Sequence, residues 1–287
     1  MAVYDLHSHS SYSDGDFDPE TLVQEAKNIG LAGLALTDHN GIGGLDRARN
    51  KAQELGLKFI GGIEISARYG PADVHVLGYG VEFNRTILEQ GLVETRRGYE
   101  ERVAEMVRRC RRGGFDKVNW EAIVDKRRKM PGSVMISFDV TQELVEKQGL
   151  SMAQAHKMTV VGGECYVPYG NWAMDPGEVV KLIQQAGGVA VLAHPGIVAH
   201  EYGKEVSEGL LRLVLAAGVD GLEIYHPFHD QLVVDELADW AVKNGLLMTG
   251  GSDWHGESRF PKSRELFGKI GVDERVFEEI QVRCRHV

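Results

Sequence analysis

The sequence predicts an α/β protein in which short buried strands alternate with helices, interrupted by an inserted helical lobe. Three observations lead to this fold class. Short apolar runs alternate with segments of helical spacing, several of these segments begin at an Asp-Pro pair or end at Gly, and the alternation stops in the middle of the chain. Strands and helices in this alternation build a parallel sheet or barrel from repeated βαβ units.

Seven apolar runs are the strand candidates, and each is only a few residues long, as expected for strands buried on both faces of a parallel sheet. They are residues 3–6, 31–36, 58–63, 74–77, 189–192, 221–224 and 246–249. The helix starts are marked by Asp18 and Asp175, each of which precedes a proline and suits an N-cap. The predicted helices are residues 19–29, 43–55, 176–186, 204–217 and 230–244.

The alternation stops over residues 84–173, which we predict to be a helical lobe inserted into a barrel formed by residues 1–83 and 174–287. Within this lobe the spacing predicts a long helix, three shorter helices and a strand. These elements are residues 84–113, 120–129, 140–148, 152–157 and, for the strand, 164–167. Lys and Arg are concentrated between Arg96 and Lys129, which is typical either of a solvated helix face paired with glutamates or of a basic wall facing an anionic substrate.

The composition is that of an ordinary globular protein, with 287 residues, 43% of them hydrophobic, and a net charge of −10. An acidic chain is poorly suited to sequence-independent binding of duplex DNA. The three cysteines form no CxxC pair, which argues against a disulfide framework or a cysteine-based zinc site. There is neither a signal-peptide pattern nor an apolar stretch of about 18 residues, so we expect a cytoplasmic protein without a membrane partner.

The predicted strands carry His, Asp or Glu at or near their ends. The carboxyl ends of parallel barrel strands meet at one mouth, where active sites form. Residues i and i+2 of a strand point the same way, so His7 and His9 present two side chains to one face, as do Asp253 and His255. Imidazole and carboxylate groups together suit Mn²⁺, Zn²⁺ or Fe²⁺. The candidate metal ligands are His7, His9, Asp14, His39, Glu64, His75, His194, Asp253 and His255.

Seven motifs follow one another along the chain: DLHSHSSYSDG, LTDHN, GIEIS, HVLGYG, VLAHPG, LEIYHP and GSDWHG. In this order they resemble the PHP (polymerase and histidinol phosphatase) family of metal-dependent phosphoesterases. The resemblance covers residues 1–80 and 185–256 and implies a distorted (β/α)₇ barrel with two or three divalent ions, usually manganese, zinc or iron, at its mouth. It implies three ligand sets, which are His7, His9, Glu64 and Asp253; Glu64, His75 and His194; and Asp14, His39 and His255.

The lobe further resembles a branch of the family that contains 3′,5′-nucleoside bisphosphate phosphatases and a 5′→3′ exoribonuclease. In that branch the lobe covers the metals and its arginines contact substrate phosphate, which makes Arg97, Tyr99 and Arg102 the counterparts here. One element departs from the branch, because an Arg-x-His pattern is replaced by Ser137-Phe138-Asp139. The exchange of a basic pair for a carboxylate leaves the substrate of this chain open.

These features predict an enzyme that hydrolyses a phosphomonoester by attack of a hydroxide held between manganese ions that share Glu64. The expected substrate is a small phosphorylated nucleotide, the 3′-phosphate of a nucleoside 3′,5′-bisphosphate, with 5′ ends of short RNA as a related substrate. Glu64 and Asp253 are the predicted catalytic carboxylates. His226 is a candidate to protonate the leaving group, His229 to bind phosphate, and Asp38 to orient a ligand histidine.

Two alternatives stay open at this point. A histidinol phosphate phosphatase would use the same metals, but the basic lobe suits a substrate with more than one phosphate. A catalytically inactive barrel that binds metal and serves as an interaction module belongs to a different class, and the complete set of nine ligand positions argues against it.

Overall fold

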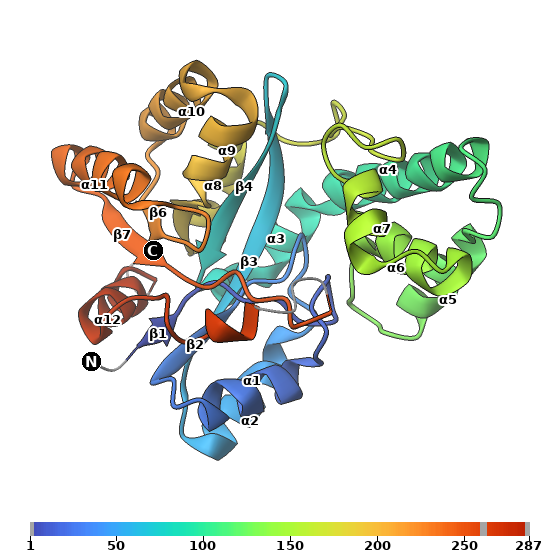
Figure 1. Cartoon of the computed structure of the whole chain (residues 1–287). Helices are drawn as coiled ribbons and strands as arrows, with labels where there is room; N and C mark the ends of the chain where they lie inside the picture. Colours follow the sequence, from blue (N-terminus) through green and yellow to red (C-terminus); the bar gives the residue numbers. More distant parts are fainter. Residues whose placement is uncertain (1–2, 259–262, 285–287) are drawn as a thin grey trace.

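The computed structural model describes residues 3–258 and 263–284. It contains a seven-stranded sheet in which each strand pairs with its neighbour in sequence, from β1 to β7 (Figure 1). The strands are β1 Tyr4–Asp5, β2 Gly33–Leu36, β3 Lys58–Tyr69, β4 Ala72–Tyr79, β5 Val189–Leu192, β6 Gly221–Tyr225 and β7 Leu247–Gly250. Each of the seven overlaps one of the apolar runs of the sequence, and β3 and β4 extend beyond their predicted ends.

Backbone contacts beyond the ends of β1 and β7 nearly close this sheet into a barrel. Ser8 forms a parallel bridge with Trp254, and the amide of His9 donates to the Trp254 carbonyl at 2.9 Å. The indole of Trp254 is buried and stacks on Phe267, with the ring centroids 4.0 Å apart. The predicted (β/α)₇ barrel is confirmed, and the segments that follow β1 and β7 lie side by side.

One strand differs from the prediction of parallel strands, because β4 runs antiparallel to both β3 and β5. Tyr69 pairs with Ala72, which leaves only Gly70 and Pro71 in the turn, with Gly70 in the left-handed region at φ 57°. A two-residue connection joins antiparallel strands, whereas a parallel crossover needs about a dozen residues or more. His75 therefore lies within β4 and not at the carboxyl end of a parallel strand.

Helices pack around the barrel and bury their apolar stripes against it (Figure 1). Asp18 accepts a hydrogen bond from the amide of Thr21 in α1, and Asp175 accepts one from Gly177 in α8, as expected for N-caps. The barrel helices are α1 Pro19–Asn28, α2 Leu45–Leu55, α8 Pro176–Gln185, α9 Pro195–Tyr202, α10 Lys204–Ala217, α11 Gln231–Asn244 and α12 Glu274–Arg283. Of the helices that the structure describes, none combines the length and apolar composition of a membrane span.

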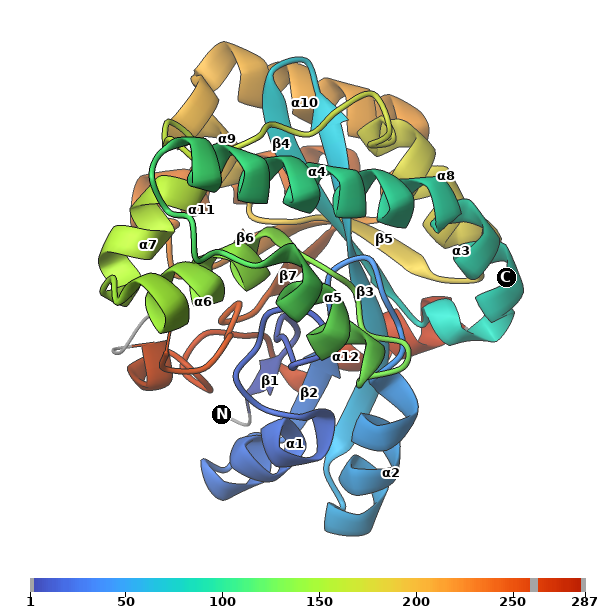
Figure 2. The same ribbon diagram turned by 90° about the vertical axis from the view of Figure 1, so that its right-hand side faces the viewer.

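The lobe lies between β4 and β5 and consists of helices and loops. Its part from α4 onward has a hydrophobic core of its own, whereas the buried residues of η1 and α3 belong to the core of the barrel. Its elements are the 3₁₀ helix η1 Val81–Asn84, α3 Arg85–Gly91, α4 Val93–Arg112, α5 Trp120–Arg128, α6 Ser137–Gln148 and α7 Met152–Thr159. The predicted long helix is thus divided at Leu92, between α3 and α4. In Figure 2 the helices α4 to α7 form a layer in front of the barrel.

The predicted strand at residues 164–167 is wrong, because this segment consists of turns and irregular chain. The carbonyls of Tyr166 and Val167 accept hydrogen bonds from Arg109 and Arg102 of α4. These two carbonyls are therefore satisfied by arginine side chains and not by a neighbouring strand.

A disulfide joins α4 to the same irregular segment. It connects Cys110 with Cys165, whose Cα atoms lie 5.2 Å apart. The sequence analysis argued against a disulfide framework because there is no CxxC pair. The two cysteines of this disulfide are 55 residues apart in the sequence, and the fold of the lobe brings them together. Cys284 is buried and free.

Candidate metal centre and substrate cavity

Nine side chains converge at the mouth of the barrel, and together they are the nine candidate ligands of the sequence. They come from the segment after β1 (His7, His9, Asp14), the segment after β2 (His39), strands β3 and β4 (Glu64, His75), the end of β5 (His194) and the segment after β7 (Asp253, His255). The near closure of the barrel and the β3–β4 hairpin bring these separate segments to one place.

Glu64 lies at the centre of this cluster with its side chain buried. Both of its carboxylate oxygens face imidazole nitrogens. From Oε2 the distances are 3.3 Å to His7 Nε2, 3.2 Å to His9 Nε2 and 3.1 Å to His39 Nδ1, and from Oε1 they are 2.9 Å to His75 Nδ1 and 3.0 Å to His194 Nε2. A carboxylate that meets imidazoles on both oxygens is placed to bridge two cations.

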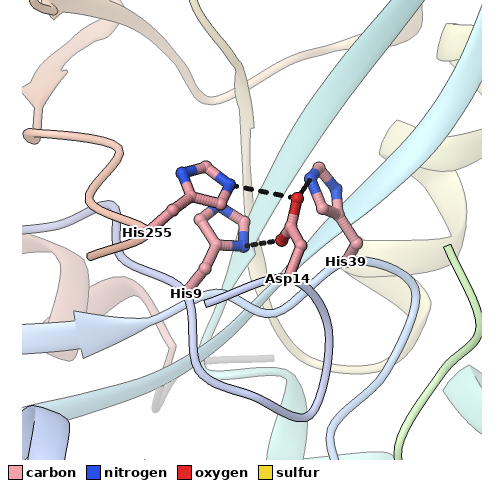
Figure 3. Close-up of side chains that lie close together, drawn as sticks. All are labelled: His9, Asp14, His39 and His255. Carbon is pink, nitrogen blue, oxygen red and sulfur yellow. Dashed lines mark ion pairs between the residues drawn. The ribbon is translucent and has the colours of Figure 1, made fainter. Parts of the chain in front are cut away.

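Asp14 lies on the other side of the cluster, between three imidazoles (Figure 3). Its Oδ2 is 3.3 Å from His255 Nε2 and 3.7 Å from His39 Nε2. Its Oδ1 is 3.6 Å from His9 Nδ1. One carboxylate and three histidines, a set that contains no sulfur donor, suit Mn²⁺, Fe²⁺ or Zn²⁺.

The candidate ligands form three groups, and within each group the ligand atoms all lie within 4.8 Å of one another. The groups are His7, His9, Glu64 and Asp253; His9, Asp14, His39 and His255; and His39, Glu64 and His75. The first contains the same residues as one predicted set, whereas His9 and His39 each belong to two groups. His194, predicted to share an ion with His75, has its Nε2 3.4 Å from His75 Nδ1.

Several buried atoms of the cluster lie close to oppositely charged groups but form no hydrogen bond of good geometry with any residue that the structure describes. These atoms are His7 Nε2, His9 Nε2, His39 Nδ1, Glu64 Oε2, His194 Nδ1 and His255 Nε2. Buried polar atoms are normally hydrogen bonded, and several orphans in one place need an explanation. Divalent ions would satisfy them, so the residues present fit a metal centre.

The charge state of the cluster also suits cations. Burial opposes ionisation of Glu64, but the neighbouring histidines hold its pKa well below the usual range. The side chain of Asp253 is 20% exposed. Its partial burial also opposes ionisation, but His7 and His255 hold its pKa well below the usual range. Burial lowers the pKa of His39 to about 3, so its imidazole is neutral at pH 7. Metal ligands must be deprotonated, and these three groups are. Burial opposes protonation of His7 and His9, but the neighbouring carboxylates raise the pKa of His7 well above its usual range and that of His9 to about 10. These two imidazoles would therefore release protons when a metal binds.

Backbone strain is concentrated at the same place. In the described ranges, the non-glycine residues with positive φ are Asn40 at 50°, His194 at 27° and Asp253 at 50°. Two of them are candidate ligands, and Asn40 directly follows a third, His39. Such conformations cost about 1–3 kcal/mol each and persist where the surrounding structure holds them, which is common at functional sites.

Glu223 is a functional residue that the sequence analysis did not assign. It is buried on β6 and accepts hydrogen bonds from His7 Nδ1 at 2.9 Å and from the amide of His194 at 2.8 Å. A carboxylate on Nδ1 fixes the ring so that Nε2 points into the cluster. The available signal was its place in the LEIYHP motif, where only His226 received a role.

Asp38, the candidate to orient a ligand histidine, acts on the segment that carries the ligands. Its carboxylate accepts hydrogen bonds from the amide and hydroxyl of Ser10, at 2.8 and 2.6 Å, and from the hydroxyl of Ser13 at 2.6 Å. Ser13 Oγ lies 3.5 Å from His9 Nδ1. Asp38 therefore reaches a ligand histidine only through Ser13.

A cavity of about 540 Å³ lies between this cluster and the lobe. Metal-ligand candidates such as Glu64 and Asp253 line it, and so do Arg102 and Tyr169 of the lobe. The cavity is in the size range of sites that enclose a small organic ligand. It therefore has room for a substrate much larger than a phosphate group.

Arg102 is a buried cation on the wall of this cavity. Its Nε donates to the carbonyl of Val167 at 2.6 Å, and its guanidinium lies 5.2, 5.6 and 4.9 Å from the ring centroids of Tyr99, Tyr166 and Tyr169. Its Nη1 has no hydrogen-bond partner in the described part of the chain. A rigidly held guanidinium with an unused donor suits an anionic group.

The other two predicted lobe contacts lie elsewhere. Arg97 is 67% exposed and forms ion pairs with Glu94 and Glu101, so it belongs to a solvated helix face outside the cavity lining. Tyr99 is buried behind the cavity wall, with its hydroxyl 3.4 Å from that of Tyr169. The interpretation as a solvated face paired with glutamates thus describes Arg97, whereas Arg102 lines the cavity.

The two histidines after β6 are both engaged with the protein. His229 donates from Nδ1 to a carbonyl of β6 at 2.8 Å and accepts at Nε2 from the amide of Gly196 at 3.1 Å, which leaves no ring nitrogen for phosphate. His226 accepts at Nδ1 from the amide of Phe228 at 3.3 Å. Its Nε2 lies 3.5 Å from Oδ2 of Asp253.

A buried cluster of histidines and carboxylates at a barrel mouth, beside a cavity with a fixed arginine, defines a metal-dependent hydrolase of phosphate esters. Comparison with known proteins agrees. Residues 5–145 match the PHP domain. The whole chain is 33% identical to the 3′,5′-nucleoside bisphosphate phosphatase of Chromobacterium violaceum, with 95% of that relative covered. The chain belongs to the PHP family.

Other relatives agree with the predicted branch and widen the range of chemistry. The chain is 30% identical to a 5′-3′ exoribonuclease of Haemophilus influenzae, with 88% of this chain and 89% of the relative covered. It is 30% identical to a phosphoribosyl 1,2-cyclic phosphate 1,2-diphosphodiesterase of Eggerthella lenta, with 89% and 95% covered. A crystal structure described as a metal-dependent phosphoesterase of Bifidobacterium adolescentis has a TM-score of 0.88 at 28% identity, covering 99% and 96%.

Proposed function

We propose that this enzyme removes the 3′-phosphate from a nucleoside 3′,5′-bisphosphate, and that it also acts on the 5′ ends of short RNA. The observation that carries the proposal is Arg102, a buried guanidinium with an unused donor in the same cavity as Glu64 and Asp253. A monophosphate bound to the metal centre would leave this cation unpaired. A second phosphate on the same substrate would give it a charge-assisted hydrogen bond.

The nine clustered residues would hold two or three Mn²⁺ ions, and Zn²⁺ or Fe²⁺ would suit the same donors. Bound divalent ions lower the pKa of water and neutralise charge on a phosphoryl group. In the protein, Glu64 supplies an ionised carboxylate with imidazoles on both of its oxygens. Asp253 supplies a second, against His7 and His9.

His226 acts through Asp253 in this proposal. Because its Nδ1 accepts from the amide of Phe228, the neutral ring carries its proton on Nε2, next to Asp253 Oδ2. That N–H would donate to the carboxylate and hold its orientation. His226 would then position a ligand, and the leaving alkoxide would take its proton from water in the cavity.

Three apolar side chains of the cavity lining suit a planar base. Val160 and Val161, at the end of α7, and Phe228, after β6, line the cavity and are 36%, 46% and 66% exposed. An aromatic ring with this much free surface can stack on a nucleobase, and base–aromatic stacking contributes about 1–3 kcal/mol. The cavity would thus offer apolar surface for the base in addition to the metal ligands and Arg102.

We expect the manganese-reconstituted protein to release phosphate from adenosine 3′,5′-bisphosphate with a kcat/KM at least about tenfold higher than from histidinol phosphate. One additional charge-assisted hydrogen bond contributes about 1.5–3 kcal/mol, which corresponds to roughly 10- to 150-fold. The check is phosphate release from both compounds in one assay, with phosphoribosyl 1,2-cyclic phosphate and a 5′-phosphorylated short RNA as further substrates. A preference for histidinol phosphate would contradict the proposal.

Arg102→Met is expected to lower kcat/KM for the bisphosphate by roughly 10- to 150-fold, because it removes the charge and keeps much of the packing against the tyrosines. Activity on a monophosphate should change much less. The matched control is Arg108→Met, on the same helix but 59% exposed and paired with Glu105. Equal losses on both substrates would mean that Arg102 does not bind the second phosphate.

A further inference from the structure

Arg127 of α5 is a buried cation that the proposed reaction does not use. It forms a two-point ion pair with Asp139 of α6, with Nε 2.9 Å from Oδ2 and Nη2 2.8 Å from Oδ1. The two side chains are 7% and 1% exposed. Bidentate geometry of this kind fixes the plane of the guanidinium as well as its position.

The remaining donors of Arg127 reach out of the lobe to the barrel. Nη1 donates to the carbonyl of Ser11 at 3.0 Å, and Nη2 donates to the carbonyl of Ser13. The carbonyl between these two, on Tyr12, accepts from the amide of Val134 in the lobe at 2.8 Å. Three consecutive carbonyls, directly before Asp14, are thus held by the lobe, and Figure 2 shows α5 beside the segment that follows β1.

The same segment is held from the barrel side by Asp38. That carboxylate accepts from the amide and hydroxyl of Ser10 and from the hydroxyl of Ser13. Residues 10–13 therefore lie between an anion of the barrel and a cation of the lobe. The side chain that follows them is Asp14, which faces His39 and His255.

The Asp139 carboxylate that departs from the branch pattern thus has a structural explanation. Asp139 caps α6 through the amide of Ile136 at 3.1 Å, and it holds Arg127 in place, with Lys126 as a further partner at 3.0 Å. A carboxylate satisfied by three donors inside the lobe is not a substrate contact.

We propose that Arg127, oriented by Asp139, is a positioning residue for Asp14, through which the lobe sets the metal affinity of the group formed by His9, Asp14, His39 and His255. The inference rests on the metal assignment above but not on the identity of the substrate. The His7–His9–Glu64–Asp253 group shares only His9 with this group, and none of its other members is adjacent in the sequence to residues 10–13.

The test is Mn²⁺ binding to metal-free protein, measured by calorimetry with metal content after desalting, and it needs no substrate. In Arg127→Met we expect one equivalent of Mn²⁺ to bind about 10–100-fold more weakly, as for other partners that orient metal ligands, while the remaining equivalents keep their affinity. Asp14→Asn should weaken the same equivalent. Arg128→Met, on the same helix but 76% exposed, should bind like the wild type.

Loss of Arg127 alone leaves the Asp139 charge buried, and the variant can fail to fold for that reason. The double variant Arg127→Met/Asp139→Asn removes both charges and keeps an acceptor for the amide of Ile136. If the double variant folds and still binds one equivalent weakly, the proposal holds. Wild-type affinity for every equivalent in a folded Arg127 variant, or equal weakening of all of them, would overturn it. A wrong substrate assignment would leave these results unchanged.

Discussion

Glu64→Ala is expected to reduce kcat/KM by at least about 10³-fold. This carboxylate touches imidazoles on both oxygens, and it belongs to two of the three groups of ligand atoms. Its removal takes away a shared ligand and the central negative charge of the site. Metal centres contribute several kcal/mol of transition-state stabilisation, and each 1.36 kcal/mol is about tenfold in rate. Steady-state phosphate release with saturating Mn²⁺ is the measurement.

A matched variant separates charge from shape at this position. Glu64→Gln keeps the size of the side chain but removes its charge, so it should lose nearly as much activity as the alanine variant. Glu54→Ala, on the exposed surface of α2, removes one carboxylate without touching the site and should leave activity unchanged. Near-normal turnover in a folded Glu64→Ala protein would mean that Glu64 does not bridge two ions.

The ligand cluster could be predicted from the sequence because its signals are local. His7 and His9 are two residues apart at a strand end, as are Asp253 and His255, and the fold closes the barrel so that these two segments meet. His75 was predicted together with the other strand-end residues and by the resemblance, but the parallel strand end expected for it was wrong, because its strand runs antiparallel and carries it mid-strand. The two-residue turn at Gly70 and Pro71 was the available signal for that reversal.

Residues that hold the cluster from a distance left no comparable local signal. Glu223 contacts His7 across 216 residues of sequence, and Arg127 reaches the carbonyls of Ser11 and Ser13 across more than 100. Glu223 lies in the LEIYHP motif, but the motif does not show which histidine it holds, and no motif quoted above contains Arg127. Only the packing of the lobe on the barrel brings these partners together.

The lobe arginines show why helical spacing alone did not assign the substrate contacts. Arg97 and Arg102 are five residues apart, which turns their side chains about 140° from each other on a helix. One is 67% exposed and paired with glutamates, and the other is buried among tyrosines. The buried face of α4 carries apolar residues such as Val103 and Met106. Arg102 also lies on the buried side, among the rings of Tyr99, Tyr166 and Tyr169, and two of these lie far along the chain.

Removal of metal is expected to lower the melting temperature of this protein by at least about 5 °C and to abolish phosphate release. The cluster contains buried nitrogens and a carboxylate oxygen without hydrogen-bond partners in the described residues, and its strained backbone at His194 and Asp253 is held by the same neighbours. A ligand present at about 100 times its Kd stabilises the folded state by about 2.7 kcal/mol per site. For a chain of this size, each kcal/mol corresponds to roughly 2–4 °C.

Thermal unfolding with excess chelator, and again after Mn²⁺ is restored, measures this effect directly. Glu64→Ala serves as the matched control, because a protein that has lost its shared ligand should gain much less from added Mn²⁺ than the wild type. If Mn²⁺ stabilised both proteins equally, the ion would be binding elsewhere on this acidic surface. Stabilisation confined to the wild type, and lost together with turnover, would locate both the ion and the chemistry at Glu64.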